Sequence, residues 1–230
     1  MDYWQQNAAH HDQAFKQGYG IHYPEGHIIR VYERILKYEL GIDGSKGEKL
    51  LDFGCGNATH SSFFRSKGFD IYGVDADATA IRRCRESFPE ISGHFEVIDP
   101  KPLLERKFFG HTYDVILANQ VLYYFSNPDL EACLRSLHSQ LRTDGVFIAS
   151  MMGPQHYFYR HSEEASEGLR RVSLSGRTKA ISLINFTYSK EDLLEKFRLF
   201  KPISIGYYDF QIREEEGSSF HYLFVGRKES

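Results

Sequence analysis

Two glycines and two aspartates carry the clearest chemical pattern in the sequence. Asp52, Gly54 and Gly56 lie in the segment LLDFGCGNATH, where an apolar run gives way to a polar one. Glycine allows a ligand to lie directly against the backbone, and the start of a following helix offers free N–H groups. Asp75 comes about 20 residues later, a spacing at which a carboxylate on a neighbouring strand end reaches ribose hydroxyls. The pattern predicts a site for a nucleoside cofactor.

The residues around this loop indicate which kind of cofactor it suits. A dinucleotide fingerprint, G-x-G-x-x-G, needs a third glycine where this sequence has Thr59, and no G-K-S/T of a phosphate-binding P-loop follows. Asp52 stands directly ahead of the loop, which suits a cationic ligand better than a pyrophosphate. A G-x-G pair alone is also typical of a tight strand-to-helix turn. A nicotinamide-dependent oxidoreductase is an alternative that Thr59 speaks against.

Apolar patterning places this loop in an alternation of strands and helices. Buried strands are expected in KLLDFG, FDIYGVD, HFEVID, YDVILAN and GVFIASMM, and helices start near Pro24, Ala58, Asp77 and Pro128. Such alternation predicts βαβ units and a parallel sheet. A capping box at Ser189 predicts another helix. PISIGYYDF and FHYLFVGRK are too close in sequence for a crossover helix, so we expect a hairpin and an antiparallel edge strand at the C-terminus.

These segments in combination resemble the motifs of the class I S-adenosylmethionine-dependent methyltransferases. The resemblance rests on L-D-F-G-C-G, G-V-D, Y-D-V-I-L-A-N-Q-V-L-Y-Y-F, L-R-T-D-G-V-F-I and the final hairpin, and it covers roughly residues 48–152 and 189–228. It implies an α/β fold with a Rossmann-like, doubly wound seven-stranded sheet, mostly parallel with an antiparallel C-terminal strand, and helices on both faces. It also implies S-adenosylmethionine as cofactor and S-adenosylhomocysteine as product.

Carried over position by position, the resemblance implies a set of cofactor contacts. The glycine loop holds the methionine end, and the acid after the second strand holds the ribose. The residues are Asp52, Gly54, Cys55 and Gly56 for the methionine end, Asp75 for the ribose, Ala76 and Asp99 for the adenine, and Asn119 and Gln120 for the methionine portion. Three places depart from the family pattern, namely Ala58 where a glycine is common, Pro100 after Asp99, and Tyr123 and Tyr124 in place of paired histidines.

We expect a single methyltransferase domain over residues 1–230, with two additions to its core. Residues 1–47 are expected to form a helical cap, and residues 153–187, which show no clear period, an insertion that acts as a substrate lid. Both additions carry tyrosines that are expected to converge on one pocket for a planar or partly apolar acceptor. The alternative for the insertion is a surface loop with incidental aromatics. The substrate-binding candidates are Tyr3, Trp4, Tyr23, Tyr123, Tyr124, Tyr157, Tyr159 and Arg160.

Methyl transfer from a sulfonium asks mainly for proximity and alignment of the two reactants. Because no catalytic constellation is obligatory, a catalytically silent cofactor-binding or scaffold protein with the same fold is a second alternative. If the acceptor is a hydroxyl or an amine, a base within hydrogen-bond reach helps, and His22, His156 and Tyr123 are the candidates. Arg170 and Arg171 open a basic stretch that indicates either an anionic acceptor or a solvated face.

The composition argues against several other classes of protein. The 28 Lys and Arg against 31 Asp and Glu give a net charge of -3, which argues against nucleic-acid binding by bulk charge. Three widely spaced cysteines fit free thiols in a reducing compartment better than disulfides or a zinc site. No apolar stretch resembles a signal peptide or a membrane span. We expect a cytoplasmic protein that acts on a small molecule without a metal, while its oligomeric state stays open.

Overall fold

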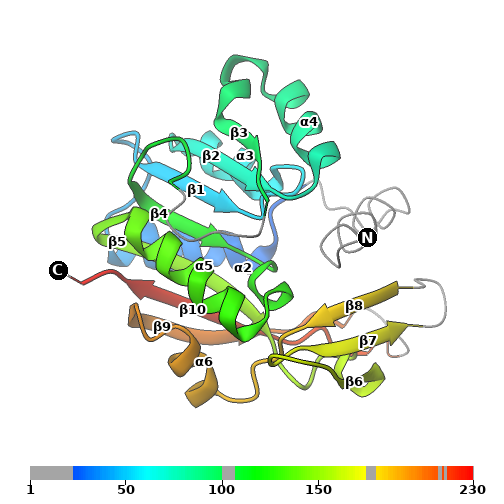
Figure 1. Ribbon diagram of the computed structural model, residues 1–230. Coiled ribbons are helices and arrows are strands. Elements are labelled where there is room, and N and C mark those ends of the chain that lie inside the picture. Colours follow the sequence, from blue (N-terminus) through cyan, green and yellow to red (C-terminus); the bar gives the residue numbers. More distant parts are fainter. Residues whose placement is uncertain (1–22, 100–106, 175–179, 212–213, 215–216, 230) are drawn as a thin grey trace.

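A computed structural model of the chain describes residues 23–99, 107–174, 180–211, 214 and 217–229. Its main sheet has the strand order β3-β2-β1-β4-β5-β10-β9 (Figure 1). Strands β1 to β5 run parallel, and β10 runs antiparallel to both of its neighbours, which confirms the predicted Rossmann-like fold. The strands are β1 (Lys49–Phe53), β2 (Asp70–Asp75), β3 (Phe95–Val97), β4 (Tyr113–Ala118), β5 (Leu141–Met152), β9 (Lys201–Tyr208) and β10 (His221–Arg227).

The C-terminal strand lies inside the sheet, so the expectation of an antiparallel strand at the sheet edge is wrong. Strand β10 pairs with β5 on one side and with β9 on the other, which makes β9 the edge strand. Phe224 and Val225 of β10 are buried, as an internal strand requires, whereas β9 carries Pro202, which has no N–H to donate. This order brings His221, the first residue of β10, to the edge where the parallel strands end.

Helices cover both faces of the sheet (Figure 1). On one face, α2, η2, α3 and α4 bury Ile28, Leu36, Phe64 and Ile81 in a single apolar cluster. On the other face, α5 and α6 contribute to a second cluster that includes Leu134. The helices are α2 (Gly26–Arg30), η2 (Val31–Glu39), α3 (Thr59–Ser66), α4 (Ala78–Ser87), η3 (Pro89–His94), η4 (Leu122–Tyr124), α5 (Asn127–Gln140), η5 (Tyr159–His161) and α6 (Lys190–Lys196).

Most helices begin at the residue types that the sequence indicated. Asp77 and Ser189 each accept a backbone N–H from the first turn of the following helix, at 2.8 and 3.2 Å. Helix α2 begins after Glu25, slightly later than expected from Pro24, and continues as a π-helix over η2. Glu25 stands at the N-cap position but makes no side-chain capping bond, so its carboxylate is available for contacts elsewhere.

Residues 153–187 contain a second sheet, so the expectation of an irregular segment is wrong. Three short strands, β6 (Ser162–Glu164), β7 (Arg170–Leu174) and β8 (Ala180–Ile184), pair antiparallel at one end of the molecule (Figure 1). The sequence shows no clear alternation of apolar and polar residues here, because these strands bury little. In β7, Val172 is buried and its two neighbours are exposed. Arg170 ties two strands together by donating to the hydroxyl and the carbonyl of Ser162 at 2.8 and 3.0 Å. The roles of this insertion as a lid and of residues 1–47 as a cap stay predictions.

Candidate functional site

The glycine loop turns sharply at the carboxyl end of β1. Gly54 and Gly56 have φ angles of 77° and 52°, in the left-handed region that favours glycine. A Cβ on Gly54 would lie 2.5 Å from a methyl carbon of Val121, while a Cβ on Gly56 would meet nothing within 4 Å. The backbone is therefore pressed against the turn after β4 at Gly54 and is open at Gly56, where a ligand has room to approach.

Asp75, the last residue of β2, faces this loop. Its two carboxylate oxygens accept the backbone N–H groups of Gly56 and Asp77, both at 2.8 Å. Burial raises the pKa of Asp75, and the two hydrogen bonds oppose that rise because they stabilise the ionised form. Each carboxylate oxygen has a second lone pair, so the fixed carboxylate suits the two adjacent hydroxyls of a ribose.

The other predicted adenine and loop residues stand around Asp75. Ala76 follows directly after β2, and Asp99 is an exposed residue just beyond β3. Both lie at the carboxyl edge of the parallel strands, where ligands of open α/β sheets bind. Asp52 is almost fully buried beneath the loop, where the Ser61 hydroxyl donates to its carboxylate at 2.6 Å. Burial raises the pKa of Asp52.

Cys55, the remaining predicted loop residue, has an unreactive thiol. A hydrogen bond with Cys84 and then burial raise the pKa of its thiol, which keeps it un-ionised and a poor nucleophile.

Among the described residues, no group of three or more His, Cys, Asp and Glu side chains has an arrangement that could hold a metal ion. In the same part of the chain, no helix combines the length and the apolar character that crossing a membrane requires.

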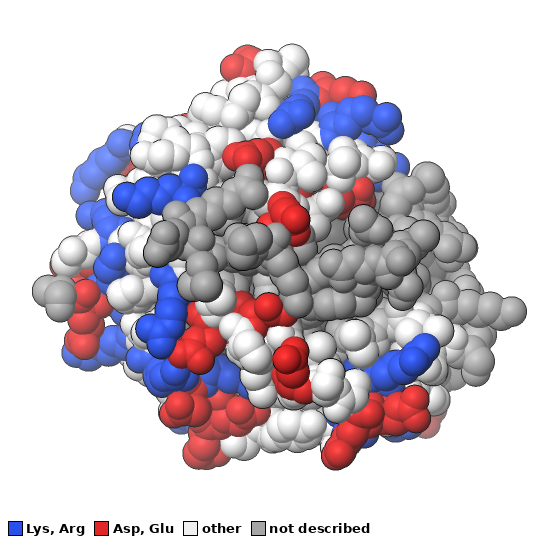
Figure 2. Space-filling view, viewed as in Figure 1, with Lys and Arg blue, Asp and Glu red and all other residues white. Residues whose placement is uncertain are grey.

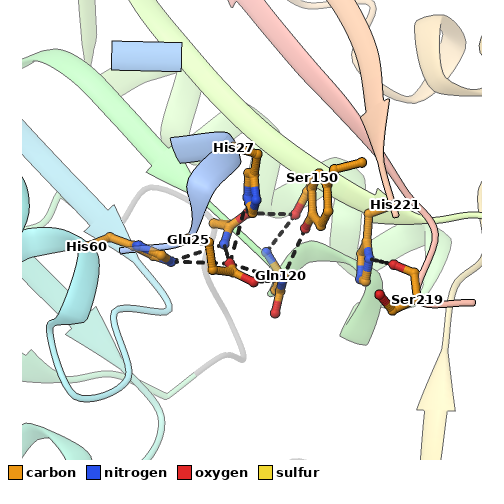
Figure 3. Close-up of polar contacts among 9 residues, drawn as sticks. Glu25, His27, His60, Gln120, Ser150, Ser219 and His221 are labelled. Carbon is orange, nitrogen blue, oxygen red and sulfur yellow. Dashed lines mark hydrogen bonds and ion pairs between the residues drawn. The ribbon is translucent and has the colours of Figure 1, made fainter. Parts of the chain in front are cut away.

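A second group of polar side chains meets at the carboxyl end of β4 (Figure 3). The Glu25 carboxylate accepts the Nδ2–H of Asn119 at 2.9 Å and the Nε2–H of Gln120 at 3.0 and 3.1 Å. The Nε2 atoms of His60 and His27 lie 3.6 and 3.7 Å from the same carboxylate. We refer to these five residues as the Glu25 cluster. They come from the start of α2, from α3 and from the turn after β4, so that only the tertiary fold brings them together.

The Glu25 cluster holds a fixed negative charge. Burial alone would raise the pKa of Glu25, but the hydrogen bond with His60, the charges of His27 and His60 and the hydrogen bond from Asn119 together outweigh it and hold the pKa at about 2. Burial lowers the pKa of His27, so this ring gains its charge only at acid pH and is neutral at neutral pH. This end of the site suits a positively charged ligand group.

The turn that carries Asn119 and Gln120 is rigidly held. The Ser150 hydroxyl on β5 donates to Oδ1 of Asn119 at 3.1 Å and accepts the backbone N–H of Gln120 at 2.8 Å. Gln120 has a φ of 56°, a left-handed conformation that costs free energy in a residue with a side chain. Such strained positions cluster at ligand sites, and here the strained residue donates its side-chain amide to Glu25.

A stack of three rings lies beside the Glu25 cluster. The Tyr208 ring, at the end of β9, is nearly parallel to those of His27 and His221, with centroids 3.7 and 5.0 Å away. The Tyr208 hydroxyl accepts the Nε2–H of Gln120 at 3.1 Å, which joins this ring stack to the cluster. The Tyr123 ring lies 5.7 Å from that of His221. One of the predicted substrate residues is thus next to the ring stack.

Two further substrate candidates share a surface pocket. Tyr157 and Arg160 line an open, polar pocket of about 240 Å³. The backbone N–H of Tyr157 donates to the carbonyl of Ser218 at 2.8 Å, which fastens this part of the insertion to the segment before β10. The other lining residues are His161, Gln211, Glu214, Gly217 and Ser218.

The remaining described substrate candidates do not share the pocket of Tyr157 and Arg160, although the ring of Tyr124 lies 4.7 Å from that of Tyr123. Tyr124 packs against the apolar cluster under α5, and Tyr159 packs edge-on against Phe186 of the insertion. The Tyr23 side chain is 82% exposed. Tyr3, Trp4 and His22 lie outside the described residues, so the convergence of the tyrosines on one pocket stays a prediction.

Sequence reasoning missed several residues that the fold brings to this edge, namely Glu25, His60, Tyr208 and His221. His221 and Tyr208 are paired in the register of β10 and β9. A signal for His221 existed, because the first residue of a strand antiparallel to a parallel sheet lies at the edge where the other strands end. Glu25 and His60 carried no such signal, since their role depends on where α2 and α3 pack.

Comparison with protein families gives a match over most of the chain. Residues 21–193 match the family model described as a methyltransferase domain. An uncharacterized methyltransferase of Synechocystis sp. is 22% identical over 116 residues, which make up 50% of this chain and 52% of that protein. The chain thus matches about half the length of this curated relative.

Many solved structures share the fold, two methyltransferases among them. A S-adenosylmethionine-dependent methyltransferase of Methanosarcina mazei has a TM-score of 0.64 and 16% identity, over 84% of this chain and 98% of its own. The 1,6-didemethyltoxoflavin-N1-methyltransferase of Burkholderia thailandensis, which contains bound 1,6-didemethyltoxoflavin and S-adenosylhomocysteine, has a TM-score of 0.64 and 17% identity, over 100% of this chain and 90% of its own. At these identities the likeness is one of fold.

Proposed function

Because the chain belongs to the methyltransferase-domain family, we propose that it transfers the methyl group of S-adenosylmethionine to a small-molecule acceptor. S-adenosylmethionine is the cofactor, and when bound it supplies a methyl group on a positively charged sulfur. The observation that carries the proposal is the Asp75 carboxylate, which two backbone N–H groups hold beside the turn at Gly54 and Gly56. This arrangement fits a nucleoside with a free ribose diol.

The proposed cofactor contacts follow the carboxyl edge of the sheet. The ribose lies at the end of β2, the adenine between the ends of β2 and β3, and the methionine portion against the glycine loop and the turn after β4. The residues that we assign are Asp75 for the ribose, Ala76 and Asp99 for the adenine, and Asp52, Gly54, Cys55, Gly56, Asn119 and Gln120 for the methionine portion.

The charges at this edge support a cationic methyl donor. Methyl transfer is an in-line displacement, and alignment of the reactants supplies about 7–11 kcal/mol of the barrier. The Glu25 carboxylate, with a pKa of about 2, is ionised at this edge, while burial lowers the pKa of His27 and of His221 and so keeps both rings neutral. The resulting negative potential attracts a sulfonium and has less hold on the neutral thioether that remains after transfer.

The acceptor is proposed to bind between the turn after β4 and the insertion. Asn185, at the end of the insertion, donates its backbone N–H to the carbonyl of Tyr123 at 2.7 Å and its side-chain amide to the carbonyl of Phe125 at 3.0 Å. These bonds fasten the insertion to the segment that follows Gln120, which supports its role as a cover. The proposed substrate contacts are Tyr3, Trp4, Tyr23, Tyr123, Tyr124, Tyr157, Tyr159 and Arg160.

Charge favours a small molecule over a nucleic acid as acceptor. The net charge is -3, and Figure 2 shows acidic and basic side chains interspersed over the described part of one face. Arg170, in the basic stretch of the insertion, has structural partners, because it binds Ser162 and lies 4.7 Å from the ring of Tyr159. The Burkholderia thailandensis enzyme, which has a small molecule as its named acceptor, supports the same choice.

Calorimetric titration with S-adenosylhomocysteine tests the cofactor site. We expect Asp75→Asn to bind about 10- to 100-fold more weakly than the wild type, because a hydrogen bond to a charged group contributes about 1.5–3 kcal/mol. Asp70→Asn is the matched control, since Asp70 lies at the opposite end of the same strand and pairs with Lys49 at 2.9 Å. Absence of binding by the wild type, or equal binding by Asp75→Asn, would refute the site.

Labelled methyl transfer tests the class of acceptor. The protein is incubated with S-adenosylmethionine carrying a labelled methyl group and with a cell extract separated by size into a small-molecule and a macromolecular fraction. We expect the label to enter the small-molecule fraction only. Label in protein or nucleic acid, sensitive to the Asp75→Asn substitution, would contradict the proposed acceptor class.

A further inference from the structure

One ring nitrogen of His221 makes a hydrogen bond, and the other has no hydrogen-bond partner among the described residues. Its Nδ1 lies 2.8 Å from the backbone carbonyl oxygen of Ser219 (Figure 3). A carbonyl oxygen only accepts hydrogen bonds, so Nδ1 must carry the proton of the neutral ring, and Nε2 is left with a free lone pair. His221 is 4% exposed, and within the described residues its Nε2 is a buried atom with no hydrogen-bond partner. An unpartnered lone pair at this depth is costly and marks a position for a hydrogen-bond donor other than the described residues.

The neighbouring His156 has the opposite arrangement. The backbone N–H of Phe158 donates to Nδ1 of His156 at 3.1 Å, so Nδ1 is the acceptor and the proton of the neutral ring sits on Nε2. The two rings stand edge to face, with centroids 5.2 Å apart. His156, which the sequence offered as a candidate base, has its lone pair occupied by the backbone, whereas the lone pair of His221 is free.

His27 also has a bare buried nitrogen, but it belongs to the Glu25 cluster. The Asn119 amide donates to Glu25, so its oxygen accepts the Nε2–H of His27 at 3.0 Å, and Nδ1 is left without a partner among the described residues. His27 is therefore positioned by the residues assigned to the methionine portion. His221 lies on the side of the ring stack that faces Tyr123 and His156.

We propose that Nε2 of His221 is the base that takes the proton of the methyl acceptor, and that the acceptor is accordingly a hydroxyl or N–H group that is protonated when it binds. This inference rests on the proposed methyltransferase function. The lone pair of the acceptor atom forms the bond to the methyl carbon, and the electrons of the carbon–sulfur bond stay on sulfur. The proton of the acceptor atom moves to Nε2 and converts His221 to an imidazolium.

The groups around His221 suit this role. Burial lowers the pKa of His221 to about 4, so the ring is neutral and its lone pair is available at neutral pH. A weak base suffices, because the acceptor atom becomes strongly acidic as it gains the methyl group. Glu25 and Asp209 are the nearby carboxylates that stabilise the charged ring, and the hydrogen bond to Ser219 persists in both forms. The rings of Tyr208, Tyr123, His27 and His156 complete its surroundings.

The tautomer of His221 can be measured without knowing the acceptor. Nitrogen-15 NMR of the histidine rings distinguishes a protonated from a bare ring nitrogen, and the spectrum of His221→Asn assigns the signals. We expect His221 to carry its proton on Nδ1 and to stay neutral down to about pH 4, and His156 to carry its proton on Nε2. The exposed His161 serves as the reference ring. A proton on Nε2 of His221, or an imidazolium at neutral pH, overturns the proposal whatever the kinetics show.

The kinetic test compares an acceptor that needs a base with one that does not. The probes are 4-methylphenol, which is protonated at neutral pH, and thiophenol, which is largely ionised, and formation of S-adenosylhomocysteine is measured. Asn in place of His221 can still donate to Ser219 but has no group at Nε2. We expect His221→Asn to lose at least ~100-fold in kcat/KM for 4-methylphenol and less than ~3-fold for thiophenol, with unchanged binding of S-adenosylhomocysteine.

The outcomes separate this inference from the proposed function. A wild type that does not bind S-adenosylhomocysteine refutes the function itself. Intact binding together with an equal loss for both probes, or with no loss for 4-methylphenol, overturns the role of His221 alone. A phenol-specific loss in His27→Asn that is absent in His221→Asn does the same, because it assigns the base to the other bare ring.

Discussion

The two halves of the candidate site are built in different ways. In the loop half, formed by residues 52–56 and Asp75, backbone N–H groups and glycines make the contacts, and the hydrogen bond from Gly56 to Asp75 joins residues 19 apart in sequence. In the cluster half, formed by the Glu25 cluster and the ring stack, side chains make the contacts. There Glu25 and Gln120 are 95 residues apart, and Gln120 and Tyr208 are 88 apart.

This difference separates what all members of a fold can share from what one chain can change. Backbone contacts depend on conformation and on the absence of a side chain, so the loop half tolerates few substitutions. Side-chain contacts depend on residue identity, so the cluster half can vary while the sheet stays the same. A fold that keeps the first half and varies the second can bind one cofactor and serve many acceptors.

The largest expected effect comes from a substitution in the loop half, at the glycine whose backbone packs against Val121. Gly54→Ala places a Cβ 2.5 Å from Val121 and in a left-handed conformation, so we expect the free energy of unfolding to fall by about 2–4 kcal/mol. Gly56→Ala is the matched control, because it has the left-handed backbone without the contact and is expected to lose about 1–2 kcal/mol. Urea unfolding measures both. Equal losses would show that the approach of Val121 does not matter.

A change of intermediate size tests whether charge organises the cluster half. The folded-state pKa of Glu25 is about 2, below the ordinary value of 4.5, so its ionisation stabilises the fold above pH 4.5 and this stability is lost as the pH falls toward 2. We expect Glu25→Gln to remove about 1–3 kcal/mol of that pH dependence. Urea unfolding at a series of pH values between these limits measures it.

The control for Glu25 is another carboxylate of the same helical segment. Glu33→Gln removes an exposed ion pair with Lys37, at 3.1 Å, and exposed pairs contribute about 0–1 kcal/mol. We expect its unfolding free energy to follow the wild type across the same pH range. If Glu25→Gln and Glu33→Gln behave alike, the Glu25 cluster is not an electrostatic unit.

The smallest expected effect concerns the backbone strain at Ala58, just after the loop half. Ala58 has a φ of 58° at the N-cap of α3, a left-handed conformation that favours glycine. Ala58→Gly should raise the free energy of unfolding by about 0.5–1 kcal/mol, because glycine relieves the left-handed strain. Ala132→Gly, within α5, should lower it by about 1 kcal/mol. A destabilising Ala58→Gly would mean that the methyl group packs usefully enough to outweigh its backbone strain.

The alternation of strands and helices and the loop half could be predicted from the sequence because both depend on local patterns. Apolar runs of strand length, caps such as Asp77, and the pair Gly54 and Gly56 all act over a few residues. The small sheet of the insertion escaped prediction because its strands are short and bury little. The position of β10 inside the sheet could not be predicted, because either strand of a hairpin can pair with β5. The sequence does not say which of the two does so.

The sequence by itself thus determined the class of fold, the glycine loop and the acid of β2, since these features follow from backbone conformation and short-range spacing. Only the tertiary structure decided that Glu25 meets Asn119 and Gln120, and that His221 stands beside Tyr208 with a bare Nε2. The physical reason is that these contacts depend on the packing of α2 against the sheet and on the order of its strands. Hydrophobic burial fixes both, and no local pattern encodes them.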